Sequence, residues 1–225
     1  MRVIIRIGGS VVASPLNPKL MTKYAELIRK LKGFGHEVAV VVGGGKVSRE
    51  FIKAAREVGL TQEEQDEIAI SVSRVIAQII AILIGGREWK SIPTTIQSAI
   101  EKFLEHRVVV MGGLKPGMTT DTVALILASK INADLVIKAT DQEGIFTQDP
   151  KTCPDAKKID ELTFNELKLF LKEKQHKAGI HQIIDPKAAE LLQEIKVPMI
   201  VLNGYNPENI IKAVKGEKIG TVIHE

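Results

Sequence analysis

Residues 37–46, which read EVAVVVGGGK, decide the fold class. Residues 37–42 form a nearly continuous apolar run, which is typical of a strand covered on both faces. Three glycines follow it directly, and residues 47–58 then have a helical pattern. The same order of strand and glycine turn opens the chain, where MRVIIRIGGS occupies residues 1–10. A strand that runs into a glycine turn and then a helix predicts a sheet of parallel strands.

Short apolar runs and longer helical patterns alternate along the rest of the chain. We expect strands at Val3–Ile7, Glu37–Val42, Arg107–Met111, Asp134–Ala139, Pro198–Leu202 and Thr221–Ile223. We expect helices at Lys19–Lys32, Val47–Val58, Glu63–Ile84, Thr95–Glu105, Thr122–Ile131, Phe164–Lys172, Pro186–Glu194 and Glu208–Val214. This order predicts an α/β fold with helices on both sides of a largely parallel sheet.

Composition excludes several classes of protein. The 225 residues carry 31 Lys+Arg against 27 Asp+Glu, a net charge of +4 that is spread along the chain, and only 4% are aromatic. We therefore expect no nucleic-acid partner. The single cysteine, Cys153, cannot form an intrachain disulfide and suits a cytoplasmic protein. Neither the amino terminus nor the most apolar stretch, Val75–Ile84, has the pattern of a signal peptide or a membrane span.

Glycine-rich loops indicate a ligand that carries phosphate. Glycine pairs or triplets end the expected strands at Gly8-Gly9, Gly43-Gly44-Gly45 and Gly112-Gly113. Open α/β sheets bind ligands at the carboxyl ends of their strands, where backbone N–H groups of glycine can approach an anion closely. One such pair could be a simple tight turn, but several at one edge favour a phosphate site.

The common phosphate-binding motifs are absent. A P-loop requires Ser or Thr after Gly-Lys, but Val47 follows Gly45-Lys46. The dinucleotide pattern requires a third glycine, and Ser48 stands at its position. The five histidines form no pair at metal-ligand spacing, so we expect no metal site built from protein ligands alone.

A different family fits the combined motifs. They are Ile7-Gly8-Gly9-Ser10, then Val41 to Lys46 with Arg49, then Gly112-Gly113 with Pro116-Gly117 and Thr119-Thr120-Asp121, then Ala139-Thr140, Gly144 and Gln148-Asp149-Pro150. Together they resemble the amino-acid kinase superfamily, and within it the chain is most similar to the archaeal UMP kinases. The resemblance covers essentially all 225 residues.

The resemblance implies a reaction and an architecture. MgATP would donate its γ-phosphoryl group to UMP and give UDP and ADP. The chain would fold as a single domain over residues 1–225, a three-layer α/β/α sandwich with a mostly parallel central sheet. Its amino half would hold the acceptor and its carboxyl half ATP, with Mg²⁺ accompanying the nucleotide. The partners implied are ATP and UMP, without a membrane, in a homo-oligomer, usually a hexamer built as a trimer of dimers.

The resemblance also implies which residues form the site. Arg6 stands where many relatives have a catalytic lysine, and Asp121 would organise the basic groups and Mg²⁺. The residues expected to bind ATP are Gly9, Ser10, Gly45, Arg49, Thr140, Phe146 and Asp149. The residues expected to bind UMP are Gly44, Asp66, Leu114, Lys115, Pro116, Gly117, Met118, Thr119 and Thr120. Asp66 is expected at the ribose, where a carboxylate can accept from two hydroxyl groups.

Elementary chemistry supports part of this assignment. Arg49 lies about one helical turn beyond Gly45, so its guanidinium can reach the anion bound by the glycine loop. Thr119 and Thr120 offer hydroxyl and amide donors to a phosphate, and Asp121 also suits a helix start.

Ile76 departs from the archaeal UMP kinases, which usually have asparagine on this acceptor-side helix.

Two other hypotheses stay open. The chain could be another small-molecule kinase of the superfamily, acting on a carboxylate, a carbamate or an isoprenoid phosphate. It could also be a binder of nucleotides or oxyanions on the same fold without catalysis. Catalysis requires that Arg6 take the place of lysine, although the two side chains differ in geometry at a phosphate.

Overall fold

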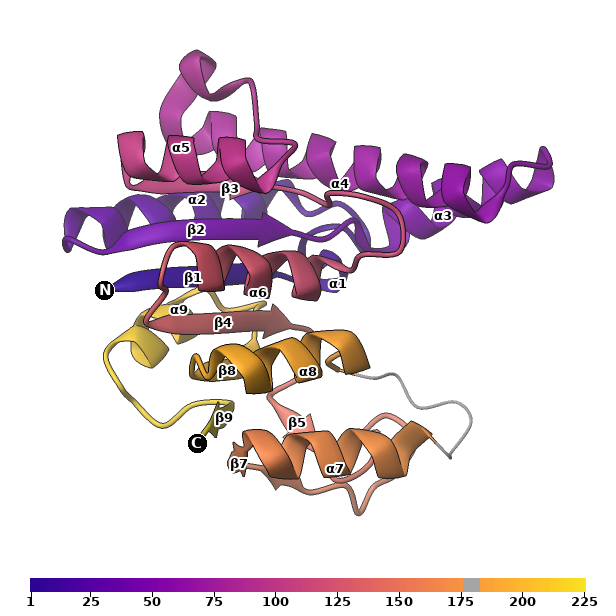
Figure 1. The fold of residues 1–225 in the computed structure, drawn as a ribbon, viewed down its shortest axis with the longest axis vertical. Helices are drawn as coiled ribbons and strands as arrows, with labels where there is room; N and C mark the ends of the chain where they lie inside the picture. The colour runs from indigo at the N-terminus through magenta and orange to yellow at the C-terminus, as the bar shows by residue number, and fades with distance from the viewer. Residues whose placement is uncertain (176–182) are drawn as a thin grey trace.

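The computed structural model describes residues 1–175 and 183–225 and has a central seven-stranded sheet in the order β3-β2-β1-β4-β8-β9-β7 (Figure 1). Its strands are β1 (Arg2–Ile7), β2 (Glu37–Val42), β3 (Val108–Met111), β4 (Leu135–Thr140), β7 (Glu161–Thr163), β8 (Met199–Asn203) and β9 (Thr221–His224). The β8–β9 pair is antiparallel, and the other neighbouring strands are parallel. The mostly parallel sheet is therefore confirmed.

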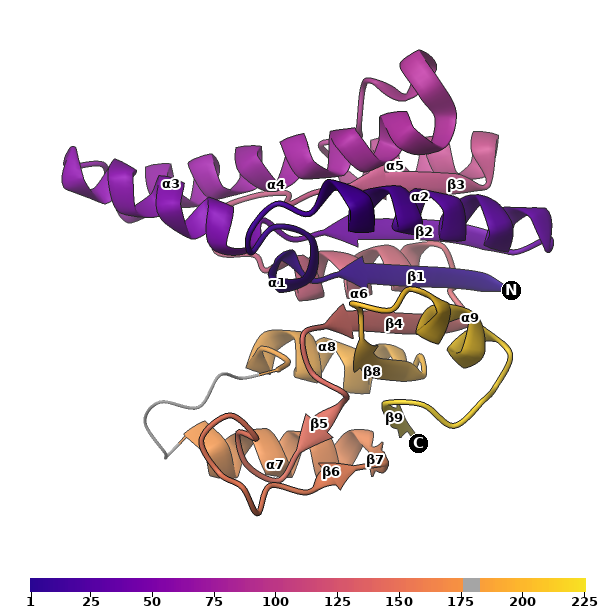
Figure 2. The same ribbon diagram turned by 180° about the vertical axis from the view of Figure 1, so that it is seen from behind.

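Helices cover both faces of the sheet and make three layers. The helices are α1 (Gly9–Val12), α2 (Pro18–Gly33), α3 (Gly45–Glu57), α4 (Gln62–Gly85), α5 (Ile96–His106), α6 (Thr120–Lys130), α7 (Phe164–Gln175), α8 (Pro186–Ile195) and α9 (Glu208–Val214). One apolar core lies between the sheet and α2, α4 and α9, and a second lies between the sheet and α5 to α8. Figures 1 and 2 show these two sets on opposite faces.

Each of the six expected strands and eight expected helices is present, with ends displaced by a few residues. The additional strands are very short: β5 (Ile145–Phe146) pairs with β6 (Lys158–Ile159), and β7 has three residues. Strands of this length carry too few side chains to show a periodic pattern in sequence. The short helix α1 and the 3-10 turn η1 (Gly86–Trp89) were also not predicted.

The sheet reverses its direction of growth beside β1. The chain passes from β1 to β2 and β3 on one side and then returns to place β4 on the other side of β1. In the register, Ile7 at the end of β1 lies between Val42 of β2 and Ala139 of β4. A crevice at such a switch point is the usual ligand site of an open α/β sheet.

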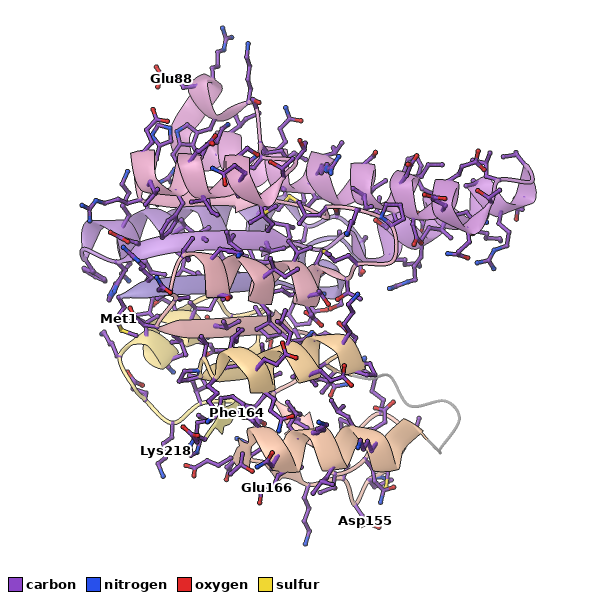
Figure 3. The ribbon with its side chains drawn as sticks, viewed as in Figure 1. Met1, Glu88, Asp155, Phe164, Glu166 and Lys218 are labelled. Carbon is purple, nitrogen blue, oxygen red and sulfur yellow. The ribbon has the colours of Figure 1, made fainter. Side chains whose placement is uncertain are left out.

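Helix α4 is longer than the apolar run seen in the sequence. Residues Gln62–Trp89, α4 with η1, form a helix that is long and apolar enough to cross a membrane, although 33% of its most apolar window is buried within the protein. A core helix of a soluble protein meets the same criterion, and α4 packs against α2, α3 and β3. Just beyond the end of α4, Glu88 projects outward from η1 (Figure 3).

Candidate active site

The glycine loops after β1 and β2 touch each other backbone to backbone. A Cβ atom added to Gly9 would lie 2.0 Å from the nitrogen of Gly45, and one added to Gly45 would lie 2.1 Å from the carbonyl oxygen of Gly9. Gly45 also has a φ of +60°, which disfavours other residues. The amide of Gly8 is already bonded to the carbonyl of Ala139, 2.8 Å away. These loops therefore form a tight floor at the switch point.

A cavity of about 340 Å³, here called the β4 cavity, opens on one side of this floor. Its walls include six of the predicted site residues, which are Arg6, Ser10, Arg49, Asp121, Thr140 and Asp149. They also include five residues that were not predicted, which are Lys138, Asp141, Gln142, Lys151 and Ile183. Four of the lining side chains are cationic and three are anionic, so the cavity suits a polar, negatively charged ligand.

Three charged side chains of the β4 cavity lining contact one another: Asp121 and Lys138 are buried, and the side chain of Arg6 is 17% exposed. Asp121 lies in the first turn of α6, and its Oδ1 is 2.8 Å from Nε of Arg6 on β1. Its other oxygen, Oδ2, accepts from Nζ of Lys138 on β4. Arg6 and Lys138 are direct neighbours in the register of the two strands. One carboxylate thus holds two cations side by side at the crevice.

The protonation of this cluster follows from burial and charge. Burial alone would raise the pKa of Asp121, but the neighbouring Arg6 and Lys138 outweigh it and hold the pKa below its usual value. Burial lowers the pKa of Lys138 to about 8, and Arg6 adds to this, while Asp121 opposes it. At neutral pH the cluster therefore contains one anion and two cations.

A second cavity of about 380 Å³, here called the α4 cavity, lies on the other side. Seven of the predicted acceptor residues line it, which are Gly44, Asp66, Lys115, Gly117, Met118, Thr119 and Thr120. The remaining lining residues are Ser48, Ala69, Ile70, Ser73 and Gly113. The wall from α4 combines apolar side chains with one carboxylate, which suits a ligand with a flat apolar part and hydroxyl groups.

Helix α4 holds the loop between β3 and α6 in place. Ser73 accepts a hydrogen bond of 2.8 Å from the amide of Gly113. Arg74 donates to the carbonyls of Gly113 and Leu114 at 3.0 and 2.9 Å. Asp66 accepts from the amide of Gly117 at 3.0 Å. These contacts join residues about 40 to 50 positions apart, so the shape of the α4 cavity depends on tertiary packing.

The two cavities meet at Arg6 and Thr120. Nη2 of Arg6, which lines the β4 cavity, donates to Oγ1 of Thr120, which lines the α4 cavity, at 3.0 Å. The neighbouring hydroxyl of Thr119 caps α6 and donates to Asp185 at 2.6 Å. Two ligands that fill the cavities would therefore approach each other beside the guanidinium of Arg6.

Some predicted site residues lie outside both linings. Gly9 and Gly45 form the floor where the loops touch, and Leu114 and Pro116 belong to the loop that encloses the α4 cavity. Phe146 lies on β5 and is half-buried. Ile76 of α4, expected on the acceptor side, is 2% exposed and points into the core that α4 covers. Its replacement of asparagine therefore changes the core rather than the cavity wall.

Lys138 is the most important charged group that the sequence interpretation missed. It interrupts an apolar strand, Leu135–Thr140, all of whose residues are buried. A lysine in a central strand is rare enough to be a signal, because lysine is almost never fully buried unless it is paired.

Within residues 1–175 and 183–225 there is no cluster of three His, Cys, Asp or Glu side chains that could hold a metal ion.

The fold and the site together define a class of protein. It is an α/β/α protein with two adjoining cavities at the switch point of a mostly parallel sheet, and glycine loops form the floor between them. Residues 1–203 match the amino acid kinase family, and the chain belongs to that family. It is 40% identical over 223 residues to the uridylate kinase of Archaeoglobus fulgidus, covering 99% of this chain and 100% of that protein. It is 39% identical to the uridylate kinase of Methanocella arvoryzae over the full length of both.

Solved structures agree with this assignment. The crystal structure of the uridylate kinase from Archaeoglobus fulgidus superposes with a TM-score of 0.89 at 38% identity, covering 99% of this chain and all of that one. The UMP kinase from Bacillus anthracis superposes with a TM-score of 0.82 at 24% identity, covering 99% and 95% of the two chains. The second likeness concerns the fold alone.

Proposed function

We propose that the protein is a UMP kinase, which transfers the γ-phosphoryl group of ATP to UMP. The observation that carries this proposal is the meeting of two cavities of suitable size at Arg6 and Thr120. Full-length similarity to uridylate kinases supports UMP as the acceptor. Phosphoryl transfer requires mainly that two anions be aligned and their repulsion offset, and a junction beside the guanidinium of Arg6 can do both.

We assign ATP to the β4 cavity. Arg49, one turn into α3, and Ser10 line the cavity where the phosphates would lie. Thr140 and Asp149 line the same cavity toward the carboxyl half of the chain. Phe146, on β5, remains the candidate for packing beside adenine. With this assignment the adenosine of ATP would lie toward the carboxyl half of the chain, which would form a single domain.

We assign UMP to the α4 cavity. Asp66 would exchange its bond with the amide of Gly117 for the ribose hydroxyl groups. Thr120 stands at the end of the cavity that adjoins Arg6, so the phosphate of UMP would lie there. Gly44 and the loop residues 114–119 would surround the nucleotide. The acceptor phosphate would then face the γ-phosphate of ATP across the junction.

Mg²⁺ would enter with ATP. Asp121 suits a metal ligand poorly, because both of its oxygens already face cations. Asp149 lines the β4 cavity and offers a carboxylate, the ligand type that Mg²⁺ prefers in addition to substrate phosphates. Asp141 lines the same cavity, and Mg²⁺ would have to compete there with Lys151, which lies 3.0 Å from its Oδ2. The ion would offset phosphate charge and lower the repulsion between the two substrates.

The assembly and the cellular compartment are also proposals. Val75, Ile79, Ile82 and Leu83 form an exposed apolar stripe along α4, at spacings that place them on one face. Covering this stripe with another copy of the chain would remove it from water, which supports a homo-oligomer such as a hexamer. We propose a cytoplasmic location, which the single cysteine suits.

An acceptor screen tests the proposed function. The purified protein is incubated with MgATP and, in turn, UMP, CMP, acetylglutamate, carbamate and isopentenyl phosphate, and ADP formation is measured. We expect turnover with UMP well above that with every other acceptor. Turnover with a different acceptor alone would identify another kinase of the family, and nucleotide binding without any turnover would identify a binding protein.

A further inference from the structure

Lys138 is a buried cation, and the proposed function gives it no role. It faces α6 from β4, as Arg6 does from β1, because Ile4 and Val136, two residues earlier on the two strands, pack in the core on that side. Lys138 is only 4% exposed, yet it lines the β4 cavity. We propose that Lys138 is a catalytic residue whose ammonium contacts the transferred phosphoryl group beside Arg6, with Asp121 as their shared counterion.

The charge balance of the cluster favours this role over a structural one. Asp121 can neutralise only one of the two cations that it contacts. Asp185, the other carboxylate that acts on Lys138, accepts from Thr119 and forms no ion pair with either cation among the described residues, so one of the two cations has no carboxylate of its own. Burying an uncompensated charge is costly, and a well-packed apolar side chain at the same position would be less so. A bound phosphoryl group supplies the missing negative charge. The cluster is therefore complete only when the substrate is present.

The chemical step needs no proton from Lys138. An oxygen of the UMP phosphate attacks the γ-phosphorus of ATP, the bond to the bridging oxygen breaks, and ADP leaves with that electron pair. Charge on the equatorial oxygens of the transferring group is offset by Lys138 and Arg6 from the adjacent strands. Because these cations are buried and fixed before the reaction, their effect is larger than it would be in water.

The protonation state of Lys138 gives the proposal a distinct signature. The charged groups that face it are Arg6 from β1, Asp121 from α6 and Asp185 from the start of α8. Together with burial they hold its pKa near 8, so the free enzyme loses this charge in mildly alkaline solution. We therefore expect kcat/KM, which reports on the free enzyme, to fall as the pH rises through about 8.

Three variants test the proposal, which rests on the proposed UMP kinase reaction. Lys138→Met removes the charge and keeps the volume, while Asp121 retains Arg6 as its partner. Lys138→Arg keeps the charge at all accessible pH values. Lys130→Met makes the same change at the exposed end of α6. Each is examined by circular dichroism, by calorimetric binding of ATP and of UMP, and by kcat and kcat/KM against pH.

We expect Lys138→Met to fold, to bind both nucleotides and to lose about 100-fold in kcat. Lys138→Arg should recover part of that loss, with its alkaline fall displaced to higher pH, and Lys130→Met should match the wild type. A Lys138→Met enzyme with near wild-type kcat, or a Lys138→Arg enzyme whose alkaline fall is unmoved, would overturn the proposal. If the wild type uses an acceptor other than UMP, the same comparison is made with that acceptor, and only the proposed function fails. A protein that phosphorylates no acceptor contradicts both.

Discussion

Asp121 is the residue on which the charge balance of the site depends. Its carboxylate faces Arg6 and Lys138 at once, and its side chain is about 10% exposed. Removing one partner of a buried ion pair leaves the other charge without compensation, which costs much more than removing a surface pair. Asp121 therefore affects both the stability of the fold and the position of the two cations. These two effects can be measured separately.

We expect Asp121→Asn to destabilise the protein by about 3–5 kcal/mol and to reduce turnover strongly. The pKa of Asp121 is lowered in the folded state, so its stabilising effect is complete above the ordinary pKa of aspartate and is lost only as the pH falls through the lowered value. Urea unfolding at pH 7 thus measures the whole effect. Asp155→Asn, at an exposed position, is the control (Figure 3). Equal stability of the two variants would contradict the role given to Asp121.

Asp66 is expected to affect the binding of UMP and not the binding of ATP. We expect Asp66→Ala to weaken UMP binding roughly tenfold or more, because hydrogen bonds to a charged group contribute about 1.5–3 kcal/mol. ATP binding should change little, since Asp66 lines the α4 cavity and not the β4 cavity. Glu63→Ala, at an exposed position on the same helix, should bind both nucleotides normally. Calorimetric titration that showed an equal loss for both nucleotides would refute the assignment.

At the scale of elements, the floor of the site depends on two glycine turns that share one small space. The loop after β1 and the loop after β2 approach so closely that neither Gly9 nor Gly45 can carry a side chain without displacing the other backbone. This contact sets the distance between the ends of the two strands and therefore the separation of the cavities. It is a structural requirement in addition to any binding of phosphate by these loops.

We expect Gly9→Ala to destabilise the protein by about 3 kcal/mol and to abolish turnover, because the new methyl group meets backbone that cannot move aside. Gly33→Ala is the matched control. Gly33 ends α2, where an added Cβ has no neighbour within 4 Å, so alanine should stabilise the helix by roughly 0.5–1 kcal/mol. Thermal unfolding and the UMP assay measure both. A Gly9→Ala protein as stable and active as the wild type would contradict the close contact.

The sequence predicts the main elements well because the long strands are continuous apolar runs that end in glycine. The hairpin of β5 and β6 and the strand β7 could not be predicted, since two or three residues become a strand only through their partners. The loops at the switch point could be predicted because their glycines mark them. Lys138 was overlooked because its role depends on Asp121, which lies 17 residues away in sequence and on another element.

The α4 cavity shows the same limit. Asp66 was assigned from a resemblance, but its contact with Gly117 across 51 positions is visible only in the structure. Ser73 and Arg74 hold the loop of residues 113–119 and carry no motif of their own. Sequence spacing identifies groups that act within one turn or helix, such as Arg49 after Gly45. Groups that meet through tertiary packing require the fold.

For the whole molecule, α4 serves two purposes at different positions along its length. Its first half lines the α4 cavity with Asp66, Ala69, Ile70 and Ser73, while its second half exposes the apolar stripe of Val75, Ile79, Ile82 and Leu83. Figure 1 shows α3 and α4 extending together past the ends of the strands. A second subunit packed on this helix would therefore lie near the acceptor and link assembly to the shape of its site.

We expect Ile79→Glu to dissociate the proposed oligomer, because a charge placed at an apolar contact between subunits would lose its hydration. Light scattering after size exclusion measures the mass directly. Leu169→Glu makes a similar change on α7, where the leucine is 60% exposed outside the α4 stripe, and should leave the assembly intact. A wild-type protein that is monomeric at micromolar concentration, or an Ile79→Glu variant with unchanged mass, would contradict this interface.

The central claim is that donor and acceptor lie in the two cavities with their phosphates meeting at Arg6 and Thr120. A crystal structure with a bisubstrate ligand, in which adenosine and uridine are joined by a polyphosphate chain, tests it most directly. We predict adenosine in the β4 cavity, uridine in the α4 cavity with its ribose at Asp66, and phosphate oxygens against Arg6. A ligand bound elsewhere, or bound with its two nucleosides exchanged, would contradict the account.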